Sequence, residues 1–241
     1  MKIIKHIPNT ITSMNLLCGL MGVIFTFKGE LDTAFYLMLA GAACDFCDGL
    51  AARALKSYSE LGKQLDSLAD MVSFGTLPAL LMHKLMIMNV GDCFWSYIPL
   101  LIAVFSALRL AKFNIDERQS DNFIGLATPA CAIICGSYAC YVINQPGSMM
   151  QAWAMCPWFI PAVSLILCGL LVSEIPMFSM KFKKSSAGTA AHRQRIIFLV
   201  IALASGIIIP VLGLNWAMIP LVIFVIYVLM NIGICLFTCK R

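Results

Sequence analysis

The sequence predicts an all-α integral membrane protein organised as one membrane domain over residues 1–241. Of these residues, 61% are hydrophobic and only 12% are charged, which leaves too little polar surface to cover a soluble globule. Eight apolar stretches also approach the length of about 20 residues that a membrane span needs. No segment between these stretches is long enough to form a separate soluble domain, and the sequence contains no convincing internal repeat.

The eight apolar stretches are predicted to be membrane-spanning helices. They cover about residues 12–27, 33–55, 65–88, 95–111, 124–143, 157–172, 196–212 and 216–237. The first follows Lys2 and Lys5 and has no small-residue cleavage pattern, so we interpret it as a span and not as a removed signal peptide. The last two lack charged residues and are interpreted as scaffold.

Polar and small residues distinguish the first three spans. Asn9, Thr12, Asn15 and Gly19 recur every three or four residues and give the first helix a polar stripe. That stripe either packs against another helix or lines a polar site. The second span is rich in Gly and Ala, which lets neighbouring helices approach closely, and Pro78 predicts a kink in the third.

The distribution of positive charge predicts the orientation of the chain. With a cytoplasmic amino terminus, fifteen of the seventeen Lys and Arg residues lie on the cytoplasmic side, leaving only Lys28 and Lys84 outside. Both chain termini are then cytoplasmic. The basic loop that contains Lys181, Lys183, Lys184, Arg193 and Arg195 is interpreted as a topology signal that also attracts anionic lipid.

The eleven cysteines do not indicate a disulfide framework, because most of them lie inside apolar stretches as small hydrophobic residues. The Cys44-x-x-Cys47 spacing occurs within a predicted span, with no thioredoxin-like pattern around it, and is not interpreted as a redox motif. Cys93 and Cys156 fall in predicted outer loops and could form a disulfide.

The main chemical signal is the stretch from Asp45 to Asp70, which reads D-x2-D-G-x2-A-R-x8-G-x3-D-x3-D. Asp45 and Asp48 are three residues apart and Asp66 and Asp70 are four apart, so each pair projects from one face of a helix. Carboxylates among apolar helices require cations. Four carboxylates without a suitable His or Cys arrangement favour Mg²⁺ or Mn²⁺, as two ions about 3.5–4 Å apart.

Further polar residues fall on the same predicted side as these acids. Arg53 lies about two helical turns beyond Asp45, where it would either contact a phosphate or extend to the membrane surface. Arg109 ends the fourth span, and an Arg there is costly unless it faces protein, water or an anion. Gly125 and Pro129 loosen the start of the next helix. We expect these segments to converge on the acids.

The Asp45 to Asp70 pattern matches all eight fixed positions of the CDP-alcohol phosphotransferase signature, so the chain resembles that family. Further stretches resemble its phosphatidylserine synthase branch, although that branch usually has Pro where this chain has Ala127. These stretches are Pro8-Asn9-x2-Thr12-x2-Asn15, residues 109–114, Gly125-Leu126-x-Thr128-Pro129 and Val172-Ser173-x-Ile175-Pro176-x2-Ser179-x-Lys181.

The resemblance implies a six-helix core around a cytoplasm-open cavity, at about residues 1–195, with about 196–241 as two additional helices. It implies a homodimer in a bacterial or archaeal cell membrane that binds membrane lipids and no nucleic acid. It also implies transfer of the phosphatidyl group of CDP-diacylglycerol to L-serine, with release of CMP and with Asp70 as the base.

We expect further residues to contact each substrate. CDP-diacylglycerol would contact Asn9, Thr12, Asp48, Gly49, Ala52, Arg53 and Gly62. For serine, the planar guanidinium of Arg109 could bind the carboxylate, and Asn114 and Thr128 could accept from the ammonium. Arg109 could instead hold the lipid phosphate or pair with Asp116. Glycerol 3-phosphate and inositol phosphate are alternative acceptors, for which Lys112, Arg118, Arg193 or Arg195 could supply charge. A membrane transporter is a further alternative, but its expected half-to-half repeat is missing.

Overall fold

The structure is a computed structural model that describes residues 6–55, 57, 59–116, 123–177 and 190–238. Its regular elements, in chain order, are the helices α1 (Ile7–Lys28), α2 (Leu31–Ala54), α3 (Glu60–Asp70), α4 (Leu77–Val90) and α5 (Leu101–Ile115), the strand β1 (Phe123–Ile124), the helices α6 (Thr128–Asn144), α7 (Met149–Ala154) and α8 (Phe159–Val172), the strand β2 (Pro176–Met177), and the helices α9 (Ala190–Val211) and α10 (Met218–Thr238). A π-helical segment, Met71–Thr76, joins α3 to α4, and a 3₁₀ segment, Phe94–Leu100, leads into α5.

The predicted all-α membrane class is confirmed. Within the described residues, five helical segments are long and apolar enough to cross a membrane, namely Ile7–Lys28, Leu31–Ala54, Glu60–Val90, Phe94–Ile115 and Met218–Cys235. Shorter apolar helices, Thr128–Asn144, Phe159–Val172 and Ile196–Val211, coincide with the remaining three predicted stretches. The number of membrane spans therefore stays a prediction.

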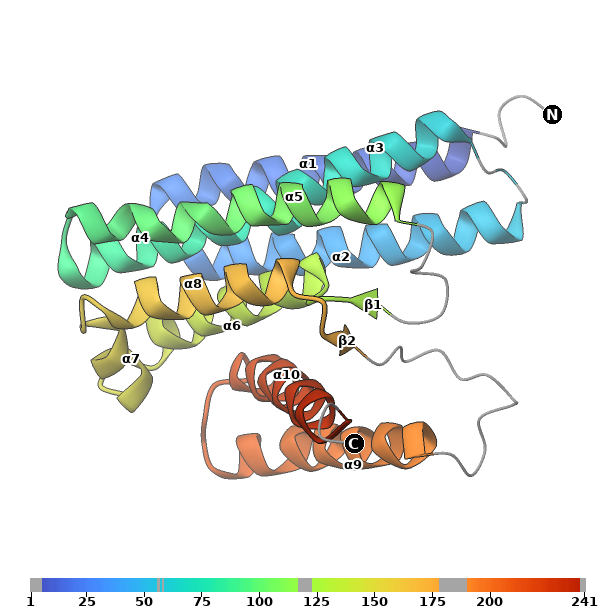
Figure 1. Cartoon of the computed structure of the whole chain (residues 1–241). Coiled ribbons are helices and arrows are strands. Elements are labelled where there is room, and N and C mark those ends of the chain that lie inside the picture. The colour runs from blue at the N-terminus through green and yellow to red at the C-terminus, as the bar shows by residue number, and fades with distance from the viewer. Residues whose placement is uncertain (1–5, 56, 58, 117–122, 178–189, 239–241) are drawn as a thin grey trace.

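The helices form a layered bundle in which α6 is the central element (Figure 1). Helix α6 packs against α2, α4 and α10, and most of its residues are buried. Gly136 allows this packing, because a Cβ atom at that position would overlap the side chains of Phe35 and Met38 on α2. Helices α9 and α10 form an antiparallel pair on one side of the bundle (Figure 1). The core therefore holds the start of α6 in a fixed position.

The third predicted span departs from a regular α-helix in the residues before Pro78, and not at Pro78 itself. The chain widens into the π-helical segment directly after Asp70, and Pro78 then lies in the first turn of α4. Proline has no backbone N–H, and its ring displaces the carbonyl four residues earlier, so a regular α-helix is disfavoured just before it. The Ser73 hydroxyl donates a 3.0 Å hydrogen bond to the Asn15 carbonyl, which fixes this segment against α1.

Two short strands were not predicted from the sequence. Strands β1 and β2 pair antiparallel, with Phe123 opposite Met177 and Ile124 opposite Pro176. Each strand has two residues, which is too short to show an alternating pattern. The expectation that Cys93 and Cys156 could pair is also not met, since both are free thiols.

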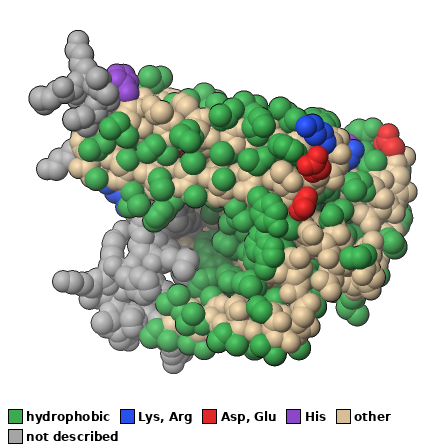
Figure 2. Space-filling model, turned by 180° about the vertical axis from the view of Figure 1, so that it is seen from behind, with side chains coloured by type: hydrophobic (Ala, Val, Ile, Leu, Met, Phe, Trp, Pro, Cys, Tyr) green, Lys and Arg blue, Asp and Glu red, His purple; other side chains and the backbone are tan. Residues whose placement is uncertain are grey.

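The surface of the bundle is largely hydrophobic, as expected for a protein surrounded by lipid. On the face shown in Figure 2, the acidic and basic side chains that are visible gather toward the two ends of the molecule. Exposed large hydrophobic residues occur along most of the helices. Lys181, Lys183, Lys184 and Ser179 lie outside the described residues, as does Arg118. For Arg193 and Arg195 only the backbone is described.

Candidate functional site

Three aspartates meet where the end of α2 faces α3. Asp45 and Asp48 come from α2 and Asp66 from α3, and one carboxylate oxygen of each lies within 4.8 Å of the other two. Asp48 is buried and accepts a 2.6 Å hydrogen bond from the Thr12 hydroxyl. We call these three residues the acidic triplet. Such a cluster of oxygen ligands could hold a divalent cation.

Asp70 lies one turn beyond Asp66 and is not part of the acidic triplet. Its Oδ1 accepts a 3.3 Å hydrogen bond from the side-chain amide of Asn15, which is fully buried. Helix α2 passes close to that amide, because a Cβ atom at Gly41 would lie 2.9 Å from Asn15 Oδ1. The polar stripe of α1 therefore lines the acidic site. Its last residue, Gly19, packs against Ser73.

The structure also places the residues that were assigned to CDP-diacylglycerol. Gly62 packs against Asn9, since a Cβ atom at Gly62 would lie 2.9 Å from Asn9 Oδ1. A Cβ atom at Gly49 would meet no atom within 4 Å, so space remains open beside the acidic triplet. Ala52 is partly exposed one turn further along α2. Arg53 is exposed, and its Nε donates a 2.9 Å hydrogen bond to the Gly49 carbonyl of its own helix.

A cavity of about 230 Å³ opens beside the acids. It is lined by residues of α3, of α5 and of the start of α6: Lys63, Asp66, Ser67, Asp70, Arg109, Leu110, Phe113, Asn114, Ala127 and Pro129. We call it the α3–α5 cavity. Its walls bring together the acidic helix, the end of the fourth predicted span and the start of the fifth, as the sequence led us to expect.

Arg109 is the most buried cation in the α3–α5 cavity, with 8% of its surface exposed. Its Nη1 donates a 2.7 Å hydrogen bond to the Thr128 hydroxyl, and its buried Nε has no hydrogen-bond partner among the residues that the structure describes. The Phe113 ring lies 5.7 Å from the guanidinium carbon. Thr128 is itself fully buried behind Arg109 and does not line the cavity. Arg109 therefore has unused donors beside two carboxylates.

Lys63 and Ser67 line the α3–α5 cavity but were not predicted as site residues. The Asn114 side-chain amide donates a 2.9 Å hydrogen bond to the Ser67 hydroxyl, and Lys63 Nζ lies 3.5 Å from the Asn114 carbonyl. Lys63 and Ser67 occupy positions that are variable, marked x, in the pattern from Asp45 to Asp70. They share a helix face with Asp66 and Asp70, because positions 63, 66, 67 and 70 follow the spacing of one helical stripe. This spacing could have identified Lys63 and Ser67 as site residues from the sequence.

The segment before α6 is tied to the end of α8. Gly125 has a φ of +74°, and its N–H donates a 3.0 Å hydrogen bond to the Ile175 carbonyl. A Cβ atom at Gly125 would lie 2.8 Å from the carbonyl oxygens of both Leu171 and Ser173. Only glycine combines this φ with such close backbone contact. The contact fixes the position from which Thr128 reaches Arg109.

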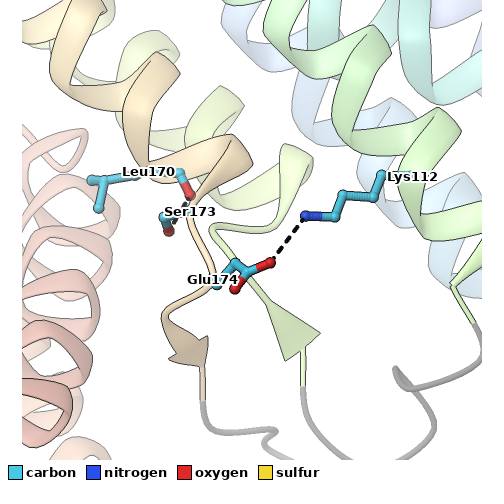
Figure 3. Close-up of polar contacts among 4 residues, drawn as sticks. All are labelled: Lys112, Leu170, Ser173 and Glu174. Atoms are coloured by element: carbon cyan, nitrogen blue, oxygen red, sulfur yellow. Dashed lines mark hydrogen bonds and ion pairs between the residues drawn. The ribbon is translucent and has the colours of Figure 1, made fainter. Parts of the chain in front are cut away.

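An ion pair joins α5 to the same region. Lys112 Nζ lies 3.8 Å from Glu174 Oε1, just before β2, and the Ser173 hydroxyl donates a 2.9 Å hydrogen bond to the Leu170 carbonyl (Figure 3). The side chains of Lys112 and Glu174 are 42% and 77% exposed, so their pairing adds little to stability. The ion pair nevertheless gives the Lys112 ammonium a partner outside the site.

Residues 5–165 match the model of the CDP-alcohol phosphatidyltransferase family. The chain belongs to this family. It is therefore an enzyme of the class that transfers a substituted phosphate from a CDP-linked alcohol. The acidic triplet and Asp70 all lie within the matched residues, and α9 and α10 lie beyond them.

Individual CDP-alcohol phosphatidyltransferases are similar to the chain over different lengths. The CDP-diacylglycerol–serine O-phosphatidyltransferase of Bacillus subtilis is 34% identical over 129 residues, which is 52% of this chain and 70% of the relative. That of Mycobacterium tuberculosis H37Rv is 31% identical over 226 residues, covering 90% of this chain and 75% of the relative. The archaetidylserine synthase of Methanothermobacter thermautotrophicus is 30% identical over 138 residues, or 55% of this chain and 57% of the relative.

Proposed function

We propose that this enzyme transfers the phosphatidyl group of CDP-diacylglycerol to L-serine and releases phosphatidylserine and CMP. The names of its relatives in bacteria and in an archaeon support serine as the acceptor. The observation that carries the proposal is the α3–α5 cavity, in which the buried Arg109 faces Asp66 and Asp70. A small zwitterion such as serine could bind Arg109 through its carboxylate and present its hydroxyl to the acids.

The acidic triplet fits divalent cations. Asp66 Oδ1 is buried and has no hydrogen-bond partner within the described part of the chain, and it lies beside two further carboxylates. Unpaired carboxylates in a membrane protein are costly, whereas hard cations prefer several oxygen ligands. Asp45, Asp48 and Asp66, with Asp70 adjacent, would hold two Mg²⁺ or Mn²⁺ ions. When bound, these ions would neutralise charge on the pyrophosphate of the lipid substrate.

Asp70 is proposed to be the base. The Asn15 amide donates to one oxygen of its carboxylate, which orients the other toward the α3–α5 cavity. The serine hydroxyl oxygen forms a bond to the phosphorus that carries diacylglycerol, while its proton passes to Asp70. The bond between that phosphorus and the oxygen of the CMP phosphate breaks, and CMP leaves with the electron pair.

Arg109 is proposed to bind the serine carboxylate, because its planar guanidinium can donate two parallel hydrogen bonds. Thr128 accepts from one Nη1 donor and leaves Nε available. The Asn114 amide nitrogen donates to Ser67, so the Asn114 side-chain oxygen remains an acceptor for the serine ammonium. Lys63 also lines the cavity and adds positive charge there.

A phosphorylated acceptor is the alternative within the same reaction class. Arg109 and Lys63 are the cations that line the cavity, and the exposed Lys112 pairs with Glu174. The relatives' names favour serine over glycerol 3-phosphate or inositol phosphate. The transporter alternative is disfavoured, because the chain belongs to an enzyme family whose signature includes every acid in the site.

In the deciding experiment, the purified protein in detergent micelles is supplied with CDP-diacylglycerol, Mg²⁺ and one acceptor at a time. Release of CMP and formation of the lipid product are followed together. We expect both with L-serine. Inactivity with serine, combined with turnover of glycerol 3-phosphate, would overturn the assignment of the acceptor. Crystals soaked in Mn²⁺ should show anomalous scattering at the acidic triplet, and none there would remove the metal proposal.

We also propose that the site and both termini face the cytoplasm, on the basis of the asymmetric distribution of Lys and Arg. An epitope tag at the carboxyl terminus should be protected from added protease in sealed, right-side-out vesicles. Cleavage of that tag would reverse the orientation. A homodimer is proposed from family resemblance, and native mass spectrometry in detergent should detect a species of two chains.

A further inference from the structure

Phe113 lies beside Arg109 in the wall of the α3–α5 cavity. The two residues are about one helical turn apart on α5, and both line the cavity. The guanidinium carbon of Arg109 lies over the Phe113 ring, 5.7 Å from the ring centre. A cation within about 6 Å of the face of an aromatic ring is attracted by the negative charge of that face. Phe113 therefore interacts with the cation that is proposed to bind the acceptor.

Apolar packing alone does not account for a large ring at this position. Of the Phe113 surface, 38% is exposed, and most of the other residues that line the cavity are polar or charged. Those polar and charged residues are Lys63, Asp66, Ser67, Asp70, Arg109 and Asn114. By contrast, the fully buried rings of Phe35 and Phe74 lie in the hydrophobic core. The contact with Arg109 gives the Phe113 ring a role within the site.

The hydrogen bond to Thr128 by itself leaves the Arg109 guanidinium free to turn. Thr128 accepts from Nη1 at 2.7 Å, and the buried Nε has no hydrogen-bond partner within the described part of the chain. A single hydrogen bond fixes one nitrogen of the planar group but not the direction of its other donors. A ring beside the group restricts this rotation, because turning away would lose the attraction to the ring face. Thr128 and Phe113 together therefore define where the remaining donors point.

We propose that Phe113 is a positioning residue that holds the Arg109 guanidinium in the orientation that binds the carboxylate of the acceptor. The proposal rests on the proposed function, since it assumes that Arg109 binds serine. A phenylalanine ring suits this role because it has no oxygen that would compete with the acceptor carboxylate for the N–H donors of Arg109. Phe113 is not a catalytic residue, because it acts through Arg109 and not on the reacting atoms.

The first test removes the aromatic face but keeps an apolar side chain, in Phe113→Leu. The strength of a cation–ring attraction predicts that the KM for serine rises about threefold to tenfold. The KM for CDP-diacylglycerol and the thermal midpoint should stay close to wild-type values. Phe113→Tyr keeps the ring face and should restore the wild-type KM for serine. The matched control is Phe25→Leu, whose ring lies 4.9 Å from Lys28 Nζ on α1 and does not line the cavity. An unchanged serine KM in Phe113→Leu, or an equal rise in Phe113→Tyr or in the control, would overturn the proposal.

A series of fluorinated phenylalanines at position 113 separates the attraction to Arg109 from packing. Fluorine withdraws electron density from the face of the ring and changes its size little, so each added fluorine weakens the attraction to a cation. We expect the serine KM to rise stepwise from one to three fluorine atoms. The same serine KM throughout the series would show that the ring acts by packing alone, against the proposal. If the wild type does not use serine, the proposed function fails, whereas normal serine use by Phe113→Leu refutes only the positioning role.

Discussion

Arg109 donates a 2.7 Å hydrogen bond from Nη1 to the hydroxyl of Thr128, which joins the end of α5 to the start of α6. Both side chains are buried, and Arg109 extends from this contact into the α3–α5 cavity. The pair therefore determines where the cation lies relative to Asp66 and Asp70.

Thr128→Val should impair use of serine. Valine has the shape of threonine but cannot accept the Arg109 hydrogen bond, which leaves a buried donor unpaired. A hydrogen bond to a charged group contributes about 1.5–3 kcal/mol, so the serine KM should rise at least about tenfold. Steady-state kinetics with each substrate varied in turn would measure this. Thr26→Val is the control, because the buried Thr26 hydroxyl donates to the Gly22 carbonyl of its own helix, α1. Equal kinetics in both variants would contradict the prediction.

Asp70→Asn should abolish release of CMP while the protein stays folded. Asparagine keeps an oxygen that can accept from the Asn15 amide, but it cannot take a proton from the acceptor hydroxyl. The variant is measured by CMP release and by thermal unfolding in detergent. Asp92→Asn serves as control, since Asp92 accepts from Ser96 and Tyr97 and lies away from the acidic triplet. Full activity of Asp70→Asn would refute its role as base.

Gly49→Ala should weaken binding of CDP-diacylglycerol without destabilising the protein. A Cβ atom at this position meets no protein atom, so the methyl group would enter the space proposed for the nucleotide. Alanine also favours a helix over glycine by about 1 kcal/mol, which should offset any loss of stability. The KM for CDP-diacylglycerol should rise, and the KM for serine should not. Gly169→Ala on α8 is the matched control, because a Cβ atom at Gly169 would also meet open space. A normal lipid KM in Gly49→Ala would argue against this location.

Gly125→Ala should both destabilise the protein and raise the serine KM. Alanine at φ +74° costs about 1–2 kcal/mol, and its Cβ atom would also press on the carbonyls of Leu171 and Ser173. The resulting shift would displace Thr128 from Arg109. Gly147→Ala is the control, since Gly147 has a φ of +79° but no atom near its Cβ position. The thermal midpoint should fall further for Gly125→Ala than for Gly147→Ala. Equal losses would show that only the backbone conformation matters.

The sequence by itself determined the class of the fold and the enzyme family of the chain. Membrane helices are encoded locally, because about 20 consecutive apolar residues suffice to specify a span. The spacing of Asp45 and Asp48, and of Asp66 and Asp70, is also local, since residues three or four apart share a helix face whatever the helix packs against. For the same reason, the family signature was readable from one continuous stretch.

Only the tertiary structure decided which of these residues meet. Thr12 bonds to Asp48 across 36 residues, and Asn15 bonds to Asp70 across 55. These long-range contacts give Asp48 and Asp70 different partners on α1, which the spacing of the four acids does not predict. Residues of α3, α5 and the start of α6 line the same cavity. This arrangement brings Arg109 into contact with Thr128 and places Lys63 and Ser67 in the cavity wall.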